Sequence, residues 1–175
     1  MNPWEEFPEV WKTQSAFFTW LRGGLRRAIW EKYPPKINFK NKKCSPPPET
    51  YTGRAKSGDY CALSGEWIAK SYLEVDHIEG NVSLREWEDV LPFIRHLCTS
   101  ADNMQLVGKE AHKIKSYAER KGISYEEARI EKEAIRTMKD KNECSKFFKS
   151  RELYVPLKKN MRSEIVKILT DESNI

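Results

Sequence analysis

Residues 73–78 read LEVDHI, residues 103–107 read NMQLV, and a histidine follows at position 112. The first stretch is an apolar run that closes on the pair Asp76-His77, and the second is an apolar run that opens on Asn103. Short apolar runs of this kind are typical of strands. His112 comes nine residues after Asn103, where a helix is predicted to start. The sequence therefore predicts two strands and a helix that carry Asp, His and Asn side chains near their ends.

This arrangement resembles the HNH (ββα-metal) nuclease motif over residues 60–115, about a third of the chain. The resemblance implies a metal-dependent endonuclease that hydrolyses phosphodiester bonds in DNA. It also implies an α+β fold, in which a ββα-metal core lies between N-terminal and C-terminal helical extensions. His77 is the expected general base, because a neutral imidazole accepts a proton readily near pH 7. Asp76 and His112 are expected to hold one divalent metal ion, and Mg²⁺ or Mn²⁺ suits these ligands best.

Asn103 has two precedents in that family. It is either a metal ligand or a brace that hydrogen-bonds across the loop and positions the base, and we favour the brace. Asp76 and His77 point to opposite faces of a regular strand, so they share one site only if the strand ends or kinks there. A carbonyl or an amide is expected to hold the second ring nitrogen of His77 and so fix its tautomer.

The cysteines that bind structural zinc in the family are largely missing from this chain. The family's first Cys-x-x-Cys corresponds to residues 61–64, which read CALS. Its second Cys-x-x-Cys-His corresponds to residues 108–112, which read GKEAH. One cysteine does not complete a tetrahedral Cys₄ site. The resemblance therefore implies no structural zinc, and packing is expected to brace the centre in its place.

Composition favours a globular protein with a polyanionic partner. The chain has 175 residues and a formal net charge of +5, which favours a polyanionic partner. Its four cysteines are scattered without metal spacing, which favours reduced thiols. The N-terminal residues lack the pattern of a secretion signal, and no apolar run has the length of a membrane span. We therefore expect a cytoplasmic protein with no membrane contact, located in the host cytoplasm if a phage encodes it.

Basic side chains on two predicted helices are candidates for DNA contact. The first helix is predicted over residues 13–33, where phosphate contact and an ordinary solvated face are equally supported. The second begins near residue 109 and is expected to present its lysines to the phosphates of the cut strand. The candidates are Arg22, Arg26 and Arg27 on the first helix, and Lys109, Lys113 and Lys115 on the second.

Three parts are predicted along the chain. Residues 1–58 are expected to form a basic helix followed by an extended, proline-rich connector from residue 33 onward. Residues 59–122 are the expected nuclease core. It includes a helix over residues 84–99, in which His96 is expected to be structural. Residues 123–175 are an expected helical extension that opens on a capping box at Ser124.

The size and layout resemble stand-alone HNH endonucleases of bacteriophages, some of which are homing endonucleases. Two other functions fit the same residues. One is a catalytically silent DNA-binding module that keeps the HNH scaffold, and the other is a factor that binds a host protein through its basic surface. The sequence leaves open the target site, nicking versus double-strand cleavage, and the oligomeric state.

Overall fold

The computed structural model describes residues 1–80 and 82–173 and has an α+β fold. The chain forms two compact units, Met1–Lys109 and Glu110–Ile175. Each unit has hydrophobic clusters of its own. Among the described residues, no helix is both long enough and apolar enough to cross a lipid bilayer.

Two short antiparallel sheets lie in the first unit. The strands β3 (Leu73–His77) and β4 (Met104–Gly108) are the two that the sequence predicts, and both are confirmed. They pair in register from Leu73 opposite Gly108 to His77 opposite Met104. Burial alternates along β3, so that Leu73, Val75 and His77 face the interior. The second sheet pairs β1 (Gly58–Tyr60) with β2 (Trp67–Ala69).

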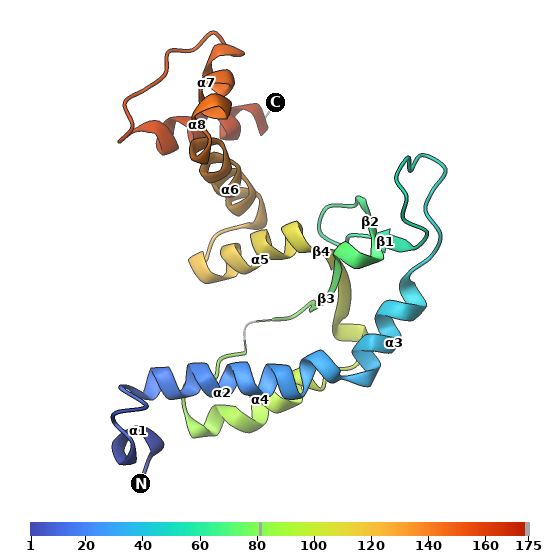
Figure 1. Cartoon of the computed structure of the whole chain (residues 1–175), viewed down its shortest axis with the longest axis vertical. Helices are drawn as coiled ribbons and strands as arrows, with labels where there is room; N and C mark the ends of the chain where they lie inside the picture. The colour runs from blue at the N-terminus through green and yellow to red at the C-terminus, as the bar shows by residue number, and fades with distance from the viewer. Residues whose placement is uncertain (81, 174–175) are drawn as a thin grey trace. The chain divides into compact units, whose positions relative to one another are not determined.

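Helices α2 (Gln14–Ala28) and α4 (Val90–Leu97) lie side by side in the first unit (Figure 1). Their contact is apolar: Phe17 and Phe18 of α2 cluster with Phe93 of α4. The prediction of a helix from residue 13 is confirmed as far as Ala28. The glycines at positions 23 and 24 leave α2 continuous, and no backbone of another described segment lies within 4 Å of a Cβ placed on either.

Residues 34–43 correct the prediction of an extended connector, because they form helix α3 (Pro34–Lys43). Pro34 and Pro35 occupy the first turn, where a backbone N–H has no partner within the helix and the fixed φ of proline fits. Phe39 of this helix packs on the β3–β4 cluster, and Lys40 Nζ donates to the Leu73 carbonyl at 2.6 Å. The prolines therefore start this helix instead of preventing it.

The expected helix over residues 84–99 is shorter than predicted. A 3₁₀ turn, η3 (Trp87–Asp89), precedes α4, and a second one, η4 (Ala101–Asn103), leads into β4. Two further 3₁₀ turns, η1 (Trp30–Lys32) and η2 (Lys70–Tyr72), and the single-turn helix α1 (Pro3–Glu6) complete the first unit as described.

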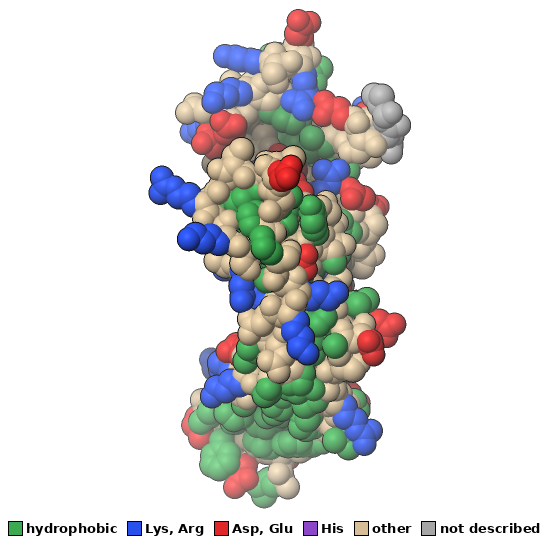
Figure 2. All heavy atoms as spheres, turned by 90° about the vertical axis from the view of Figure 1, so that its right-hand side faces the viewer, with side chains coloured by type: hydrophobic (Ala, Val, Ile, Leu, Met, Phe, Trp, Pro, Cys, Tyr) green, Lys and Arg blue, Asp and Glu red, His purple; other side chains and the backbone are tan. Residues whose placement is uncertain are grey.

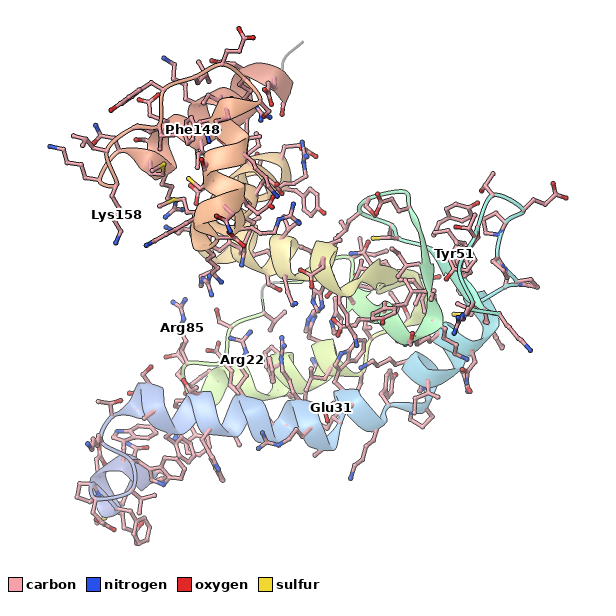
Figure 3. All side chains as sticks on the ribbon, turned by 45° about the horizontal axis from the view of Figure 1, so that its top comes forward. Arg22, Glu31, Tyr51, Arg85, Phe148 and Lys158 are labelled. Carbon is pink, nitrogen blue, oxygen red and sulfur yellow. The ribbon has the colours of Figure 1, made fainter. Side chains whose placement is uncertain are left out.

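The second unit is helical. Gly122 ends α5 in the left-handed conformation, with φ of 68°, and its N–H bonds to the Ala118 carbonyl. Ser124 and Glu127 form the predicted capping box at the start of α6. Phe148 (Figure 3) lies almost fully buried in a cluster with Ile165. The helices are α5 (Lys109–Lys121), which begins one residue before the unit boundary, α6 (Tyr125–Lys139), α7 (Lys141–Lys149) and α8 (Met161–Ser173).

A single buried thiol ties the β1–β2 turn to β4. The Sγ atom of Cys61 accepts the N–H of Gly108 at 3.2 Å, and the N–H of Ala62 bonds to the Leu106 carbonyl at 2.8 Å. Burial raises the pKa of the Cys61 thiol, but hydrogen bonds from Gly108, Ser64 and Leu63 outweigh it and lower the pKa below its usual value. These hydrogen bonds lie in the two segments that the sequence resemblance aligns with zinc-binding cysteines, and we expect them to act as the brace there.

Replacing Cys61 by Ala is expected to lower the free energy of unfolding of the first unit by about 1–3 kcal/mol, because it leaves a buried N–H without its acceptor. All six tryptophans lie in this unit, so urea unfolding followed by tryptophan fluorescence measures the effect. The exposed Cys98, replaced by Ala, is the matched control and should change little. Equal effects of the two substitutions would contradict the proposed brace.

Candidate active site

The candidate site is built around His77, the last residue of β3. Its side chain is on the interior face of the strand and only 6% exposed. Two aromatic rings stack on it. The Trp30 ring, just after α2, lies 4.1 Å from the His77 ring centroid, and the His96 ring of α4 lies 4.0 Å away. Both are nearly parallel to the His77 ring, at 27° and 24°. Since two rings do not fit on one face at this distance, Trp30 and His96 cover opposite faces.

The hydrogen bond of His77 determines which ring nitrogen carries the proton. Its Nε2 atom lies 3.0 Å from the backbone carbonyl oxygen of His96. A carbonyl only accepts, so Nε2 carries the hydrogen and Nδ1 of the neutral ring is the basic nitrogen. From the sequence we expect a carbonyl or an amide to hold one ring nitrogen of His77, and the carbonyl of His96 lies in that position.

The surroundings of His77 keep its ring uncharged. Burial, followed by the charges of His96 and Arg26, lowers the pKa of His77 from 6.5 to about 4, although the His96 carbonyl and Asp76 oppose this shift. The pKa of His96 is also lowered, by burial and then by Arg26 and Arg22. His77 is therefore neutral at pH 7, and a pKa of about 4 makes it a weaker base than an unperturbed histidine.

Asp76 is on the other face of β3. Its Oδ2 atom accepts a hydrogen bond from Gln105 Nε2 at 3.3 Å, and the same amide group lies 3.4 Å from the His77 carbonyl. Pairing remains regular up to His77 opposite Met104, and the strand ends there. The strand ends at His77, but its pairing stays regular through both residues, so the side chains of Asp76 and His77 lie on opposite faces.

Asn103 fastens the loop that follows His77. Its Oδ1 atom accepts the N–H of Glu79 at 2.8 Å, and its Nδ2 atom donates to Thr99 Oγ1 at 3.2 Å. Its own backbone carbonyl accepts the N–H of Ile78 at 3.0 Å. These are the contacts of a brace, the role that we favour for this residue.

Two arginines of α2 lie near the histidines. Arg22 (Figure 3) points one Nη2 group at the Val82 carbonyl, 3.5 Å away, and its charge lowers the pKa of His96. The charge of Arg26 lowers the pKa of both His77 and His96. Arg22 and Arg26 are therefore the predicted DNA-binding residues that the first unit brings to the candidate site.

Two other predicted residues in the first unit do not act on the histidines. Arg27 is exposed on α2 and is not among the charges that shift either pKa. Lys109 places its Nζ atom 5.8 Å from the centroid of the Tyr72 ring. Their assignment to DNA contact remains a prediction from the sequence.

Three predicted residues belong to the second unit, on α5. His112 is partly buried. Lys113 is exposed and forms an ion pair with Glu110 at 2.6 Å. Lys115 has a side chain only 16% exposed and lies 3.7 Å from Glu119. Lys115 is thus less available to a phosphate than the sequence pattern suggests, whereas Lys113 is accessible.

Sequence reasoning missed two members of the site. Trp30 gave no sign of its role, because its contact with His77 depends on how the chain turns after α2. His96 was expected to be structural, which fits its contacts, but the sequence did not indicate that its ring and carbonyl both contact His77. The signal available for His96 was the scarcity of histidine in the chain, which has three.

Comparison with protein-family models, with curated proteins and with solved structures gave no match. Within residues 1–80 and 82–173, no three His, Cys, Asp or Glu residues form a group arranged to hold a metal ion. The ligand set expected from the sequence has two protein residues.

The stability of the first unit is expected to fall as the pH drops from 6.5 toward 4. In this range the unfolded chain protonates His77, whereas the folded site, with a pKa of about 4, does not. The contribution of neutral His77 to the free energy of unfolding is fully present above pH 6.5. It is lost progressively on acidification, by about 3 kcal/mol in total.

Tryptophan fluorescence during urea unfolding, recorded in EDTA at about pH 7 and about pH 4.5, measures this loss. The substitution His77→Gln should remove most of the difference between the two pH values, since glutamine does not titrate. An unchanged pH dependence in that variant would show that other groups cause it.

Proposed function

We propose that this protein is an HNH endonuclease that hydrolyses phosphodiester bonds in DNA with the help of a divalent metal ion. The observation that supports it most strongly is the state of His77. The ring is neutral at pH 7, its Nε2 atom is held by the His96 carbonyl, and Nδ1 is the basic nitrogen. A general base for water needs this protonation state and a fixed orientation.

In the proposed reaction, Nδ1 of His77 takes a proton from a water molecule as its oxygen attacks phosphorus. The new P–O bond forms while the bond to the leaving oxygen breaks. Trp30 and His96 cover the faces of the ring, and the Nε2 edge is already bonded. Nδ1 is therefore the nitrogen that would accept the proton in this scheme.

In this scheme Asn103 is a positioning residue, which holds the loop after His77 and so the base itself. Its bonds to Glu79 and Thr99, and the bond from Ile78 to its carbonyl, fix the chain immediately after the base. Displacements of about 1 Å reduce rates by up to about 10²-fold when a base must meet its substrate in one geometry. The brace is thus expected to affect turnover more than affinity.

The metal ligands are taken from the sequence pattern, which pairs Asp76 with His112. One carboxylate and one imidazole form a donor set that suits Mg²⁺ or Mn²⁺ with further oxygen ligands. The hydrogen bond from Gln105 orients the Asp76 carboxylate. A bound cation would supply Lewis-acid stabilisation of the leaving oxygen.

Replacing His77 by Ala is expected to lower the rate of plasmid nicking by about 10²–10⁴-fold, the usual contribution of a general base. Supercoiled plasmid incubated with Mg²⁺ or Mn²⁺ measures this rate, and EDTA should abolish it in the wild-type protein. Affinity for DNA, measured in EDTA, should change little.

Added imidazole provides the control for the role of His77, since it can restore a missing base but not a damaged fold. Partial recovery of nicking in the His77→Ala variant is the expected result. Undiminished nicking in a variant with native tryptophan fluorescence would exclude His77 as the base.

Replacing Asn103 by Ala is expected to lower kcat by about 10–100-fold with little change in KM, because the loop after the base loses its anchor. The exposed Asn142 on α7, replaced by Ala, is the matched control. A rise in KM at constant kcat would instead assign Asn103 to substrate binding.

A second function is supported by the burial of His77. A DNA-binding module that keeps the HNH scaffold without catalysis tolerates a base that is 6% exposed, whereas catalysis requires water to reach it. DNA binding in EDTA together with no metal-dependent nicking would favour this alternative. Binding to a host protein that survives nuclease treatment would favour the interaction factor.

A further inference from the structure

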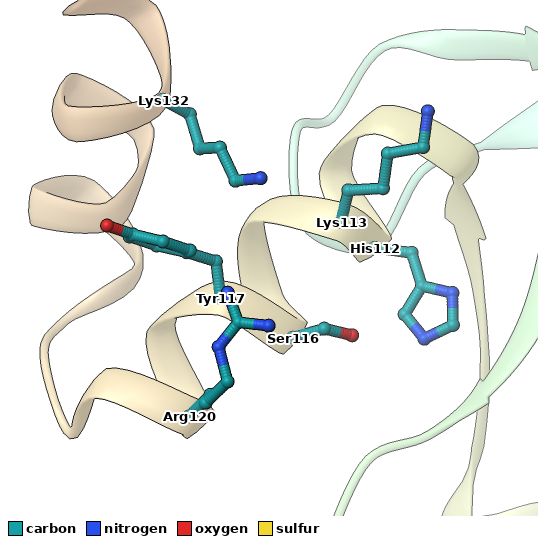
Figure 4. Close-up of a pocket in the computed structure, with 6 residues that line it drawn as sticks. All are labelled: His112, Lys113, Ser116, Tyr117, Arg120 and Lys132. Atoms are coloured by element: carbon teal, nitrogen blue, oxygen red, sulfur yellow. The ribbon is translucent and has the colours of Figure 1, made fainter. Parts of the chain in front are cut away.

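The second unit contains a basic pocket between α5 and α6 (Figure 4). Its volume is about 260 Å³. Six residues line it: His112, Lys113, Ser116, Tyr117, Arg120 and Lys132. Three of these side chains are cations, one is an aliphatic hydroxyl and none is a carboxylate. The lining is therefore suited to an anion.

Arg120 and Lys132 differ in their surroundings from the cations of this unit that form ion pairs. Within the described part of the chain neither forms an ion pair with an acidic residue. Each lies instead near the Tyr117 ring, with Lys132 Nζ 5.0 Å and Arg120 Cζ 5.4 Å from its centroid. By contrast, Arg129 pairs with Glu126 at 2.8 Å, and Lys146 pairs with Glu143 at 3.0 Å.

The Tyr117 ring is held in place. Its hydroxyl group donates to Glu131, and Arg162 Nη2 donates to both the Tyr117 oxygen, at 3.2 Å, and Glu131, at 2.6 Å. The ring is 7% exposed and packs against Ala118 and Ala128. The two pocket cations therefore lie beside a fixed surface, which reduces the ordering needed to bind a ligand.

Charge is mixed on the face drawn in Figure 2, where Lys and Arg side chains are interspersed with Asp and Glu side chains. A net charge of +5 spread in this way gives a weak general attraction to polyanions. A local group of cations without carboxylates is thus a better binding site than the surface as a whole.

The geometry points to a phosphate site: the α5–α6 pocket binds a backbone phosphate of nucleic acid through Arg120 and Lys132, with the Ser116 hydroxyl as a further donor. Guanidinium matches phosphate oxygens in a bidentate geometry, and ammonium adds a point charge. The choice of nucleic acid over free phosphate rests on the proposed function. Nothing in the binding step requires cleavage.

The test compares the full-length protein with the double variant Arg120→Gln/Lys132→Gln. Fluorescence anisotropy of a labelled DNA duplex is recorded in EDTA over a series of salt concentrations, so that no cleavage occurs. The variant should bind roughly tenfold more weakly at low salt, and its slope of log K against log salt should be shallower by about 0.9 for each phosphate that it no longer neutralises.

The control is Arg129→Gln/Lys146→Gln, which removes the same two residue types from positions outside the pocket. It should leave affinity nearly unchanged. Equal weakening in both variants would overturn the proposal, because only general charge would then matter. Inorganic phosphate serves as the competitor. Loss of its binding in the pocket variant, with unchanged DNA affinity, would overturn the choice of nucleic acid.

This experiment distinguishes failure of the phosphate-site proposal from failure of the proposed nuclease function. If the pocket binds DNA but the wild-type protein does not nick plasmid, the proposed nuclease function fails and the phosphate site stands. If the protein nicks plasmid and the pocket variant binds like the control, the phosphate site fails and the nuclease function stands.

Discussion

The antiparallel pairing of β3 with β4 is the constraint on which the rest of the candidate site depends. Its register places His77 opposite Met104, next to Asn103, and places Leu73 opposite Gly108. One end of the ladder therefore carries His77, the base that we propose, and Asn103, which bonds to the loop after it. The other end carries the N–H group that bonds to Cys61. A slip of one residue would reverse every side chain of β3 and move His77 out of the interior.

The helices that cover this ladder give His77 its chemical character. A histidine at the end of an exposed strand would have the ordinary histidine pKa of about 6.5. Here Trp30 and His96 enclose the ring, and the nearby positive charge of Arg26 further opposes protonation. The positive charge of Arg26 disfavours the protonated form of the His77 ring, and it would attract an anion to the surroundings of that ring. Burial and charge thus act together on one imidazole.

The second unit uses charge differently. Several of its cations are neutralised within their own helices by acidic residues three positions away, which adds only about a few tenths of a kcal/mol per pair. Among the described residues, Arg120 and Lys132 form no such pair and lie beside a tyrosine that hydrogen bonds hold in place. The unit therefore combines a helical scaffold of modest surface charge with a local basic pocket.

The sequence by itself determined the elements whose signals are local. Short apolar runs predicted β3 and β4, the helix predicted from residue 13 is α2, and the capping box at Ser124 marked the start of α6. It also singled out Asp76, His77 and Asn103. The sequence did not predict α3, because prolines that break a helix in its interior also begin one. Only the tertiary structure determined that Trp30 and His96 enclose His77 and that a carbonyl holds its Nε2 atom. Those contacts join residues distant in the chain, and their positions depend on how whole helices pack, which no local pattern encodes.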